Sequence, residues 1–179
     1  MSKGSLQFKV VEDAATTKAA RELIGEYLHW VAQVADKNYG LSFDIEAMIA
    51  SDVEDRSKFY PPHGRLYVMR YDGTYVGVGC LKRLAPGAAE LQRMYVQPHA
   101  RGIGAGRRLL QLLLDDARAI GYRTVRLESL KALTSAHALY RSAGFVEVPS
   151  YAENSMADFQ PADTMDKYRS SAVFMELSL

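Results

Sequence analysis

The stretch RGIGAG, residues 101–106, places three glycines behind an arginine and directly before a leucine-rich amphipathic segment. Glycine lets the backbone adopt positive φ and approach a ligand closely. A helix that starts here would also present unpaired N–H groups and a partial positive charge. Together these features predict a binding site for a phosphate or pyrophosphate group. A turn with a purely structural role is the competing interpretation.

Two common phosphate-binding loops do not fit this stretch. A Walker A loop ends in Gly-Lys-Ser/Thr, whereas Gly106 is followed by Arg107 and Arg108. The dinucleotide fingerprint G-x-G-x-x-G needs a glycine where this chain has Arg107. The glycines therefore indicate a different anion-binding loop.

The chain before the glycines predicts helices followed by an antiparallel meander. Residues 6–11 are expected to form a strand, and a helix capped by Thr16 or Thr17 should run to about Ala35. A second helix is expected after Asp44. Asp-Gly and Pro-Gly turns then separate three further expected strands, at residues 65–71, 75–83 and 90–96.

After the glycines the pattern changes to alternating helices and strands. A helix should follow and end at Gly121, and a shorter one, capped by Thr134 or Ser135, should end at Gly144. The remaining strands are expected at residues 124–130, 145–148 and 172–177. Residues 149–170 show no clear pattern. The whole chain, residues 1–179, is predicted to be a single α/β domain with a mixed sheet of about seven strands.

Composition narrows the function classes. Lys+Arg is 22 and Asp+Glu is 21, so the formal charge of +1 provides no bulk field for nucleic acid or an anionic membrane. No stretch is long and apolar enough for a membrane span, and no signal peptide is visible, so a cytoplasmic location is expected. The single cysteine, Cys80, is expected in the core, and the four histidines share no metal-ligand spacing. No metal, nucleic acid or membrane partner is predicted.

Three motifs together resemble the GCN5-related N-acetyltransferase (GNAT) superfamily. Arg101, Gly104 and Gly106 match its phosphate loop, Arg/Gln-x-x-Gly-x-Gly/Ala. The strand ELQRMYV, residues 90–96, is similar to the family's fourth strand. The pattern A-x-x-L-Y-x-x-x-G-F is similar to its second signature and lies at Ala136, Leu139, Tyr140, Gly144 and Phe145. The resemblance implies a mixed, mostly antiparallel sheet with helices on both faces, and acetyl-CoA as co-substrate.

The resemblance also implies where acetyl-CoA binds. In this family the fourth strand diverges from the next parallel strand at a bulge, and pantetheine enters between the two strands. The backbone groups concerned would belong to Met94, Tyr95 and Val96. The pyrophosphate would lie on backbone N–H groups of Arg101, Gly102, Ile103, Gly104, Ala105 and Gly106. Arg107 and Arg108 could face the 3′-phosphate, and a solvated surface is the alternative for both. Leu133 replaces an asparagine common in relatives, so its contacts are not implied here, although Glu128 and Ser129 could supply others.

Two residues are implied to be catalytic. Tyr140 corresponds to the family's general acid near the sulfur, and a core role is the alternative. Glu90 is the candidate general base, and the alternatives are a solvated charge at the strand end or a chain of water molecules. The implied activity is direct transfer of acetyl to an amine of a small molecule or peptide. A non-catalytic acyl-CoA-binding module is the alternative function. Dimers are common in this superfamily, so a homodimer is also compatible.

Overall fold

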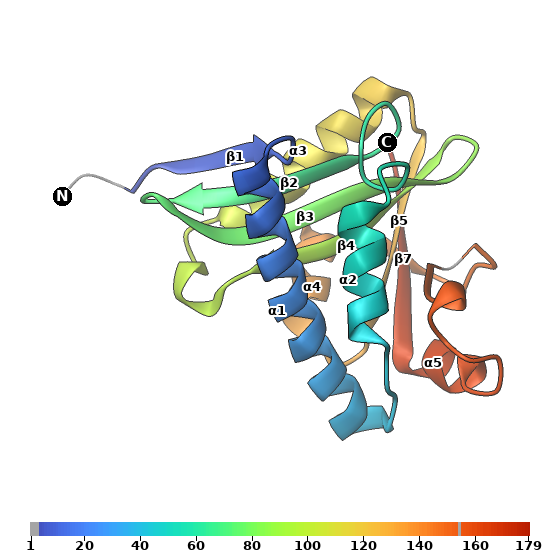
Figure 1. Ribbon diagram of the computed structural model, residues 1–179. Helices are drawn as coiled ribbons and strands as arrows, with labels where there is room; N and C mark the ends of the chain where they lie inside the picture. The colour runs from blue at the N-terminus through green and yellow to red at the C-terminus, as the bar shows by residue number, and fades with distance from the viewer. Residues whose placement is uncertain (1–3, 154) are drawn as a thin grey trace.

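A seven-stranded sheet forms the centre of the computed structural model, which describes residues 4–153 and 155–179. Its strand order is β1-β2-β3-β4-β5-β7-β6 (Figure 1). The strands are β1 (Leu6–Val10), β2 (Arg65–Tyr71), β3 (Thr74–Ala85), β4 (Ala88–Val96), β5 (Thr124–Leu130), β6 (Val146–Val148) and β7 (Ala172–Ser178). Among the strands of the described residues, β4 and β5 alone pair in parallel. The predicted mixed, mostly antiparallel sheet is confirmed.

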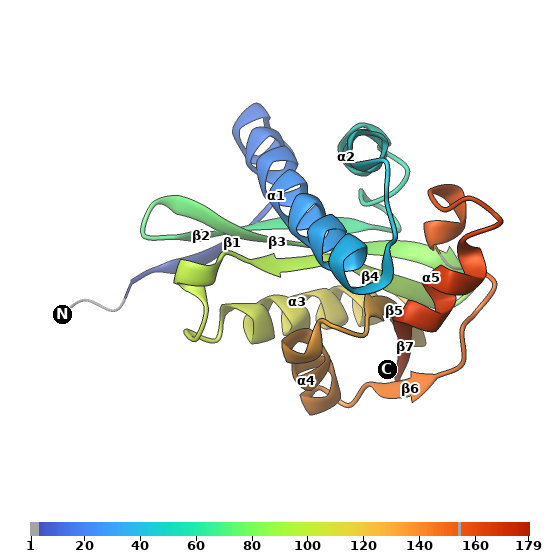
Figure 2. The ribbon, with the colours of Figure 1, turned by 90° about the horizontal axis from the view of Figure 1, so that it is seen from below.

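Helices cover both faces of this sheet. They are α1 (Ala14–Tyr39), α2 (Ile45–Glu54), α3 (Ala105–Ile120), α4 (Thr134–Ser142) and α5 (Met165–Ser171), with short 3₁₀ turns η1 (Pro98–Ala100) and η2 (Ser155–Asp158). Figure 2 shows α1 and α2 above the sheet and α3 and α4 below it. Two separate apolar clusters match these two layers, because α1 and α2 pack with one cluster and α3 with the other. Among the described residues, no helix has the length and apolar character of a membrane span.

Two predicted helix caps are wrong. At α1 the side chain of Asp13 accepts the N–H of Thr16 at 2.7 Å, and Thr16 bonds back to Asp13, so Thr16 lies inside the helix as part of a capping box. The helix also runs past Ala35 to a left-handed Gly40. At α4 the residue before the helix is Leu133, and no side chain caps this end. Its first amides are therefore left without a side-chain partner from the cap.

A bulge in β4 causes the central divergence of the sheet. Val78 pairs with Tyr95 and Cys80 with Gln92, so one residue of β3 opposes two of β4. Arg93, one of those two, has φ +54°, which is unusual for a residue with a side chain. Parallel pairing of β4 with β5 ends at Glu90. From there to Val96 the backbone of β4 has no partner in β5, as the resemblance implied.

Residues 149–170, which had no predicted structure, contribute η2 and α5 to the face that carries α1 and α2. Met156 and Tyr168 are buried there against the same apolar cluster. Figure 2 shows this segment beside the ends of β4 and β5. It therefore completes the wall around the diverging strands.

Candidate active site

The glycine-rich stretch forms an open loop at the start of α3. Gly102 and Gly104 have φ of +82° and +80°, and a Cβ atom on either would meet nothing within 4 Å. The residue before the helix is Gly104, which provides no side-chain cap, and the first bond after it runs from Arg108 N–H to Gly104 O at 3.1 Å. The amides of residues 105–107 precede that bond and remain available. Loop and helix start thus form a site for an anion.

The arginine that opens the loop is directed back toward β4. Its Nε donates to the Val96 carbonyl at 2.8 Å, and its guanidinium lies 5.9 Å from the ring centroids of both Trp30 and Tyr95. The backbone N–H of Arg101 bonds to Pro98 O at 3.3 Å. Arg101 therefore fixes the position of the loop on the sheet, while its neighbours present the amides. Arg107 and Ile103 are exposed beside them.

The loop adjoins the diverging end of β4. A Cβ atom on Gly106 would lie 3.6 Å from Leu139 of α4 and 3.8 Å from Val96 of β4. Tyr95 donates from its hydroxyl to Glu26 of α1 at 2.7 Å, which ties the same strand to the other face. The predicted acetyl-CoA residues of the loop and of residues 94–96 are thus brought together in one region.

Tyr140 reaches this region from α4. It is buried, its ring lies 5.8 Å from that of Phe145, and its hydroxyl makes no hydrogen bond with another described residue. Burial, and then the nearby Tyr27, raise the pKa of Tyr140 well above its usual value of 10. Tyr27 belongs to α1, so the electrostatic effect acts from the opposite face of the sheet. A protonated hydroxyl is thus available where the strands diverge.

Two carboxylates lie on the α1 side of the same strands. Glu90 is 0% exposed and accepts hydrogen bonds from Tyr151, at 3.1 Å, and from Gln92. The alternative of a solvated strand-end charge is therefore wrong. Glu128 of β5 accepts from Tyr168, and its second carboxylate oxygen has no hydrogen-bond partner among the described residues. Burial, and then the charge of Glu90, raise the pKa of Glu128 to about 8.

A cavity of about 60 Å³ opens in front of Glu128, between α1, α2 and the segment that contains α5. Its walls are aromatic and aliphatic, and its polar groups come from β4 and β5. The lining includes Tyr27, Val31, Phe43, Met48, Leu133, Met156 and Tyr168 around Gln92, Arg93, Glu128 and Ser129. A mostly apolar cavity with a few converging polar groups is typical of a small-molecule site.

A buried ion cluster holds the bulge beside this cavity. Asp52 of α2 is fully buried and lies 2.5 Å from Lys58 Nζ and 2.5 Å from Arg93 Nε. The pairing fixes Arg93 in its unusual backbone conformation by tying it to α2. One carboxylate thus balances two cations, and the cluster keeps a surplus positive charge.

The sequence suggested Glu128 only as a further contact to coenzyme A, and it did not single out Tyr27, Arg93 or Asp52. The alternation of TVRLESL could have placed Glu128 on the polar face of β5. The other three become neighbours only through the packing of α1 and α2 on the sheet. Cys80 is buried, and burial raises the pKa of its thiol well above the usual value, so its predicted core role is confirmed. No metal-binding group of three or more His, Cys, Asp or Glu residues occurs in residues 4–153 and 155–179.

Comparison with known proteins identifies the family. Residues 21–145 match the model of the acetyltransferase (GNAT) family. An uncharacterized N-acetyltransferase of Schizosaccharomyces pombe is 29% identical over 74% of this chain and 77% of its own length. An IAA acetyltransferase of Azospirillum brasilense is 37% identical over 63% of this chain and 72% of its own length. The paia N-acetyltransferase of Thermoplasma acidophilum, solved in complex with coenzyme A, superposes with a TM-score of 0.67 at 18% identity, covering 98% of this chain and 99% of that chain. This chain therefore belongs to the acetyltransferase (GNAT) family and is an acyltransferase.

Proposed function

We propose that the enzyme transfers acetyl from acetyl-CoA directly to the amine of a small molecule or a peptide. The observation that carries this proposal is a series of neighbours beside the point where β4 leaves β5. The glycine loop contacts α4 at Leu139, next to Tyr140. Tyr27 acts on Tyr140 from the other face and lines the cavity of Glu128. The Thermoplasma acidophilum neighbour, which shares this fold, was solved with coenzyme A bound.

The residues around the glycine loop fit coenzyme A. The pyrophosphate would accept hydrogen bonds from the amides of residues 102–107, where the space above Gly102 and Gly104 is open. Pantetheine would pair with backbone groups of residues 94–96, which have no partner in β5. The exposed guanidinium of Arg107 would lie near the 3′-phosphate. The acetyl group would then lie at the divergence, with its carbonyl near the N–H of Met94.

Glu128 is the group best placed to take the proton of the amine. It lines the cavity, and one of its oxygens is unpaired, whereas Glu90 is fully buried behind Tyr151 and Gln92. With a pKa near 8, Glu128 matches the proton affinity that a general base needs close to neutral pH. Glu90 contributes by raising that pKa. The base predicted at Glu90 thus becomes a pair of carboxylates.

Tyr140 completes the chemistry at the leaving group. The amine nitrogen attacks the thioester carbonyl carbon, so a C–N bond forms and the C–S bond breaks. Of the two protons that leave the ammonium nitrogen, the first passes to Glu128. The second leaves the nitrogen after the C–N bond has formed and restores the hydroxyl of Tyr140, which has given its own proton to the departing sulfur. The raised pKa of Tyr140 keeps its hydroxyl protonated until negative charge develops on the sulfur.

An acetyl-transfer assay over a broad amine panel tests this proposal by measuring the release of free thiol. Calorimetry should first detect binding of coenzyme A to the full chain. Turnover with at least one amine, lost in the variant Glu128→Gln, is the expected result. Coenzyme A binding without turnover on any amine would favour the non-catalytic module instead. Absence of coenzyme A binding would overturn the proposal altogether.

A further inference from the structure

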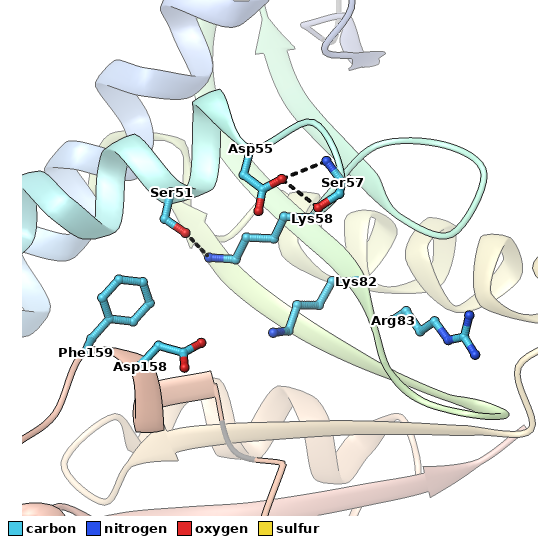
Figure 3. A pocket seen from close by; sticks show the side chains of 8 residues that line it. All are labelled: Ser51, Asp55, Ser57, Lys58, Lys82, Arg83, Asp158 and Phe159. Atoms are coloured by element: carbon cyan, nitrogen blue, oxygen red, sulfur yellow. Dashed lines mark hydrogen bonds between the residues drawn. The ribbon is translucent and has the colours of Figure 1, made fainter. Parts of the chain in front are cut away.

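A second, larger cavity of about 260 Å³ lies beside the proposed acceptor site on the same face of the sheet. Figure 3 shows it between the end of α2, the strand β3 and the residues at η2. Three basic side chains, Lys58, Lys82 and Arg83, line it together with Asp158 and Phe159. None of these side chains has a role in the chemistry proposed above.

The charged groups of this cavity differ in how far they are already satisfied. Asp55 accepts the N–H and hydroxyl of Ser57 at 2.9 and 2.6 Å. Lys58 donates to Asp52 at 2.5 Å and to Ser51 at 3.2 Å. The side chains of Lys82, Arg83 and Asp158 make no hydrogen bond or ion pair within residues 4–153 and 155–179. Lys82 and Asp158 thus remain available to a ligand, whereas Figure 3 shows the guanidinium of Arg83 directed away from the two lysines.

The buried end of the cavity carries a surplus of positive charge. Asp52 is shared between Lys58 and Arg93, so one carboxylate faces two cations there. Burial lowers the pKa of Lys58 although Asp52 opposes the shift, and Arg93 and Lys82 lower it further. Figure 3 shows the ammonium groups of Lys58 and Lys82 directed into the same space. An anion placed between them would relieve their repulsion.

The cavity adjoins the acceptor site, because Lys58 lines the one, Arg93 lines the other, and both bind Asp52. Lys82 lies opposite Glu90 in the pairing of β3 with β4, and its charge influences the pKa of Glu128. Glu90 in turn pairs with Arg126, two residues before Glu128. Two strand spacings put the backbones of Lys82 and Arg126 roughly 10 Å apart, and Glu128 follows two residues later on β5. A flexible acceptor could therefore place its amine at Glu128 and an anionic group at Lys82.

We infer that the acceptor is an amine carrying a carboxylate at its far end, and that Lys82 and Lys58 bind this carboxylate. The inference rests on the amine acetylation proposed above. A single negative charge fits better than a phosphate dianion, because the unpaired carboxylate of Asp158 lies on the same wall. The chain between amine and carboxylate would pass the Asp52 cluster, which lies between the two cavities.

The test compares ε-aminocaproate with ε-aminocaproamide, which differ in charge but hardly in shape. The expected kcat/KM is at least about tenfold higher for the carboxylate, a typical effect of one charge-assisted hydrogen bond. The variant Lys82→Gln should reduce this ratio about tenfold. A ratio measured on one variant is insensitive to any change in the pKa of Glu128, because both acceptors use the same base. Lys18→Gln, on an exposed residue of α1, is the matched control and should leave the ratio unchanged.

A binding measurement separates this inference from the proposed function. Calorimetry on the full chain with coenzyme A should detect the product ε-acetamidocaproate more strongly than its amide, and Lys82→Gln should abolish the difference. Charge-dependent binding without turnover would support the carboxylate site and count against the proposed acetyl transfer. Equal kcat/KM for the two acceptors, or equal binding of the two products, would overturn the inference while leaving acetyl transfer intact.

Discussion

The two sides of the diverging strands are built by different means. On the coenzyme A side, the proposed contacts come from the backbone of the glycine loop, and the local sequence decides them. On the acceptor side, the proposed contacts come from charged side chains such as Glu128 and Arg93, held by α1, α2 and the segment before β7. The first side depends on glycine conformation, and the second on buried electrostatics. Substitutions on the coenzyme A side should therefore change coenzyme A affinity, whereas those on the acceptor side should change stability or turnover.

The largest effect should follow from Asp52→Ala on the acceptor side. The substitution leaves Arg93 and Lys58 buried without their shared carboxylate. Breaking a buried ion pair from one side costs about 3–5 kcal/mol of stability. Urea unfolding should show this loss in the free energy of unfolding. Asp115→Ala removes an exposed pair with Arg118 and should change it by less than about 0.5 kcal/mol. If both variants lost the same free energy of unfolding, the buried ion cluster would not be what stabilises the acceptor side.

Glu128→Gln should reduce kcat by about two orders of magnitude, because it removes the proposed base. In the native enzyme, kcat at saturating acceptor should rise with pH and level off above about 8, the pKa of Glu128. The variant should lose this acid limb while binding coenzyme A normally. If Glu90→Gln abolished the limb and Glu128→Gln kept it, the base would be Glu90 as predicted from the sequence.

Glu128→Gln should raise stability even though it lowers kcat. The pKa of Glu128 is higher in the folded chain than its ordinary value of 4.5, so the folded state holds a proton that the unfolded state releases. Its contribution to stability is therefore complete below pH 4.5 and is lost as pH rises toward 8. Glu128→Gln, which cannot ionise, should become more stable relative to the native chain between those values. Urea unfolding of both proteins at pH 5 and pH 9 checks this trend.

Tyr140→Phe should lower kcat by about tenfold to a hundredfold, since it removes the proposed proton donor. The Tyr140 hydroxyl has no partner among the described residues, so the variant should keep its stability and its affinity for coenzyme A. Tyr122→Phe is the control, because Tyr122 donates to the His63 carbonyl at 2.7 Å, away from the proposed site. It should lose some stability and keep its activity. If Tyr140→Phe lost stability but kept its activity, Tyr140 would be a core residue without a catalytic role.

The proposed coenzyme A side rests on a prediction from the sequence, because its determinants are local. The spacing of Arg101, Gly104 and Gly106 and the pattern around Tyr140 each lie within one short segment. Residues 65–71 and 124–130 coincide with strands as predicted, because alternation and turn residues determined them. The predicted cap of α1 was wrong because Asp13, not Thr16, occupies the N-cap position. Which of the two residues caps the helix depends on side-chain geometry at the helix start.

The acceptor side could not be predicted in the same way. Asp52 and Arg93 are 41 residues apart and become partners only when α2 packs on β4. Residues 149–170 have neither helical nor strand periodicity, yet Tyr151 and Tyr168 bond to Glu90 and Glu128. Charged residues scattered along a sequence are normally predicted to be exposed to solvent. Here they are buried by contacts between segments that lie far apart in the sequence. The acceptor class is therefore inferred from the structure alone.

The smallest effect, and the most direct measure of the coenzyme A side, should come from Gly104→Ala. Gly104 and Gly121 have φ of +80° and +100°, and a Cβ atom on either meets nothing within 4 Å of the chain. Each alanine variant should therefore lose about 1–2 kcal/mol of stability through the left-handed backbone. Only Gly104 lies at the proposed pyrophosphate site, so calorimetry should show coenzyme A binding weakened about tenfold in Gly104→Ala and unchanged in Gly121→Ala. Equal affinity in the two variants would mean that the loop shape is not what binds the anion, and the contrast between a backbone-built and a side-chain-built site would not hold.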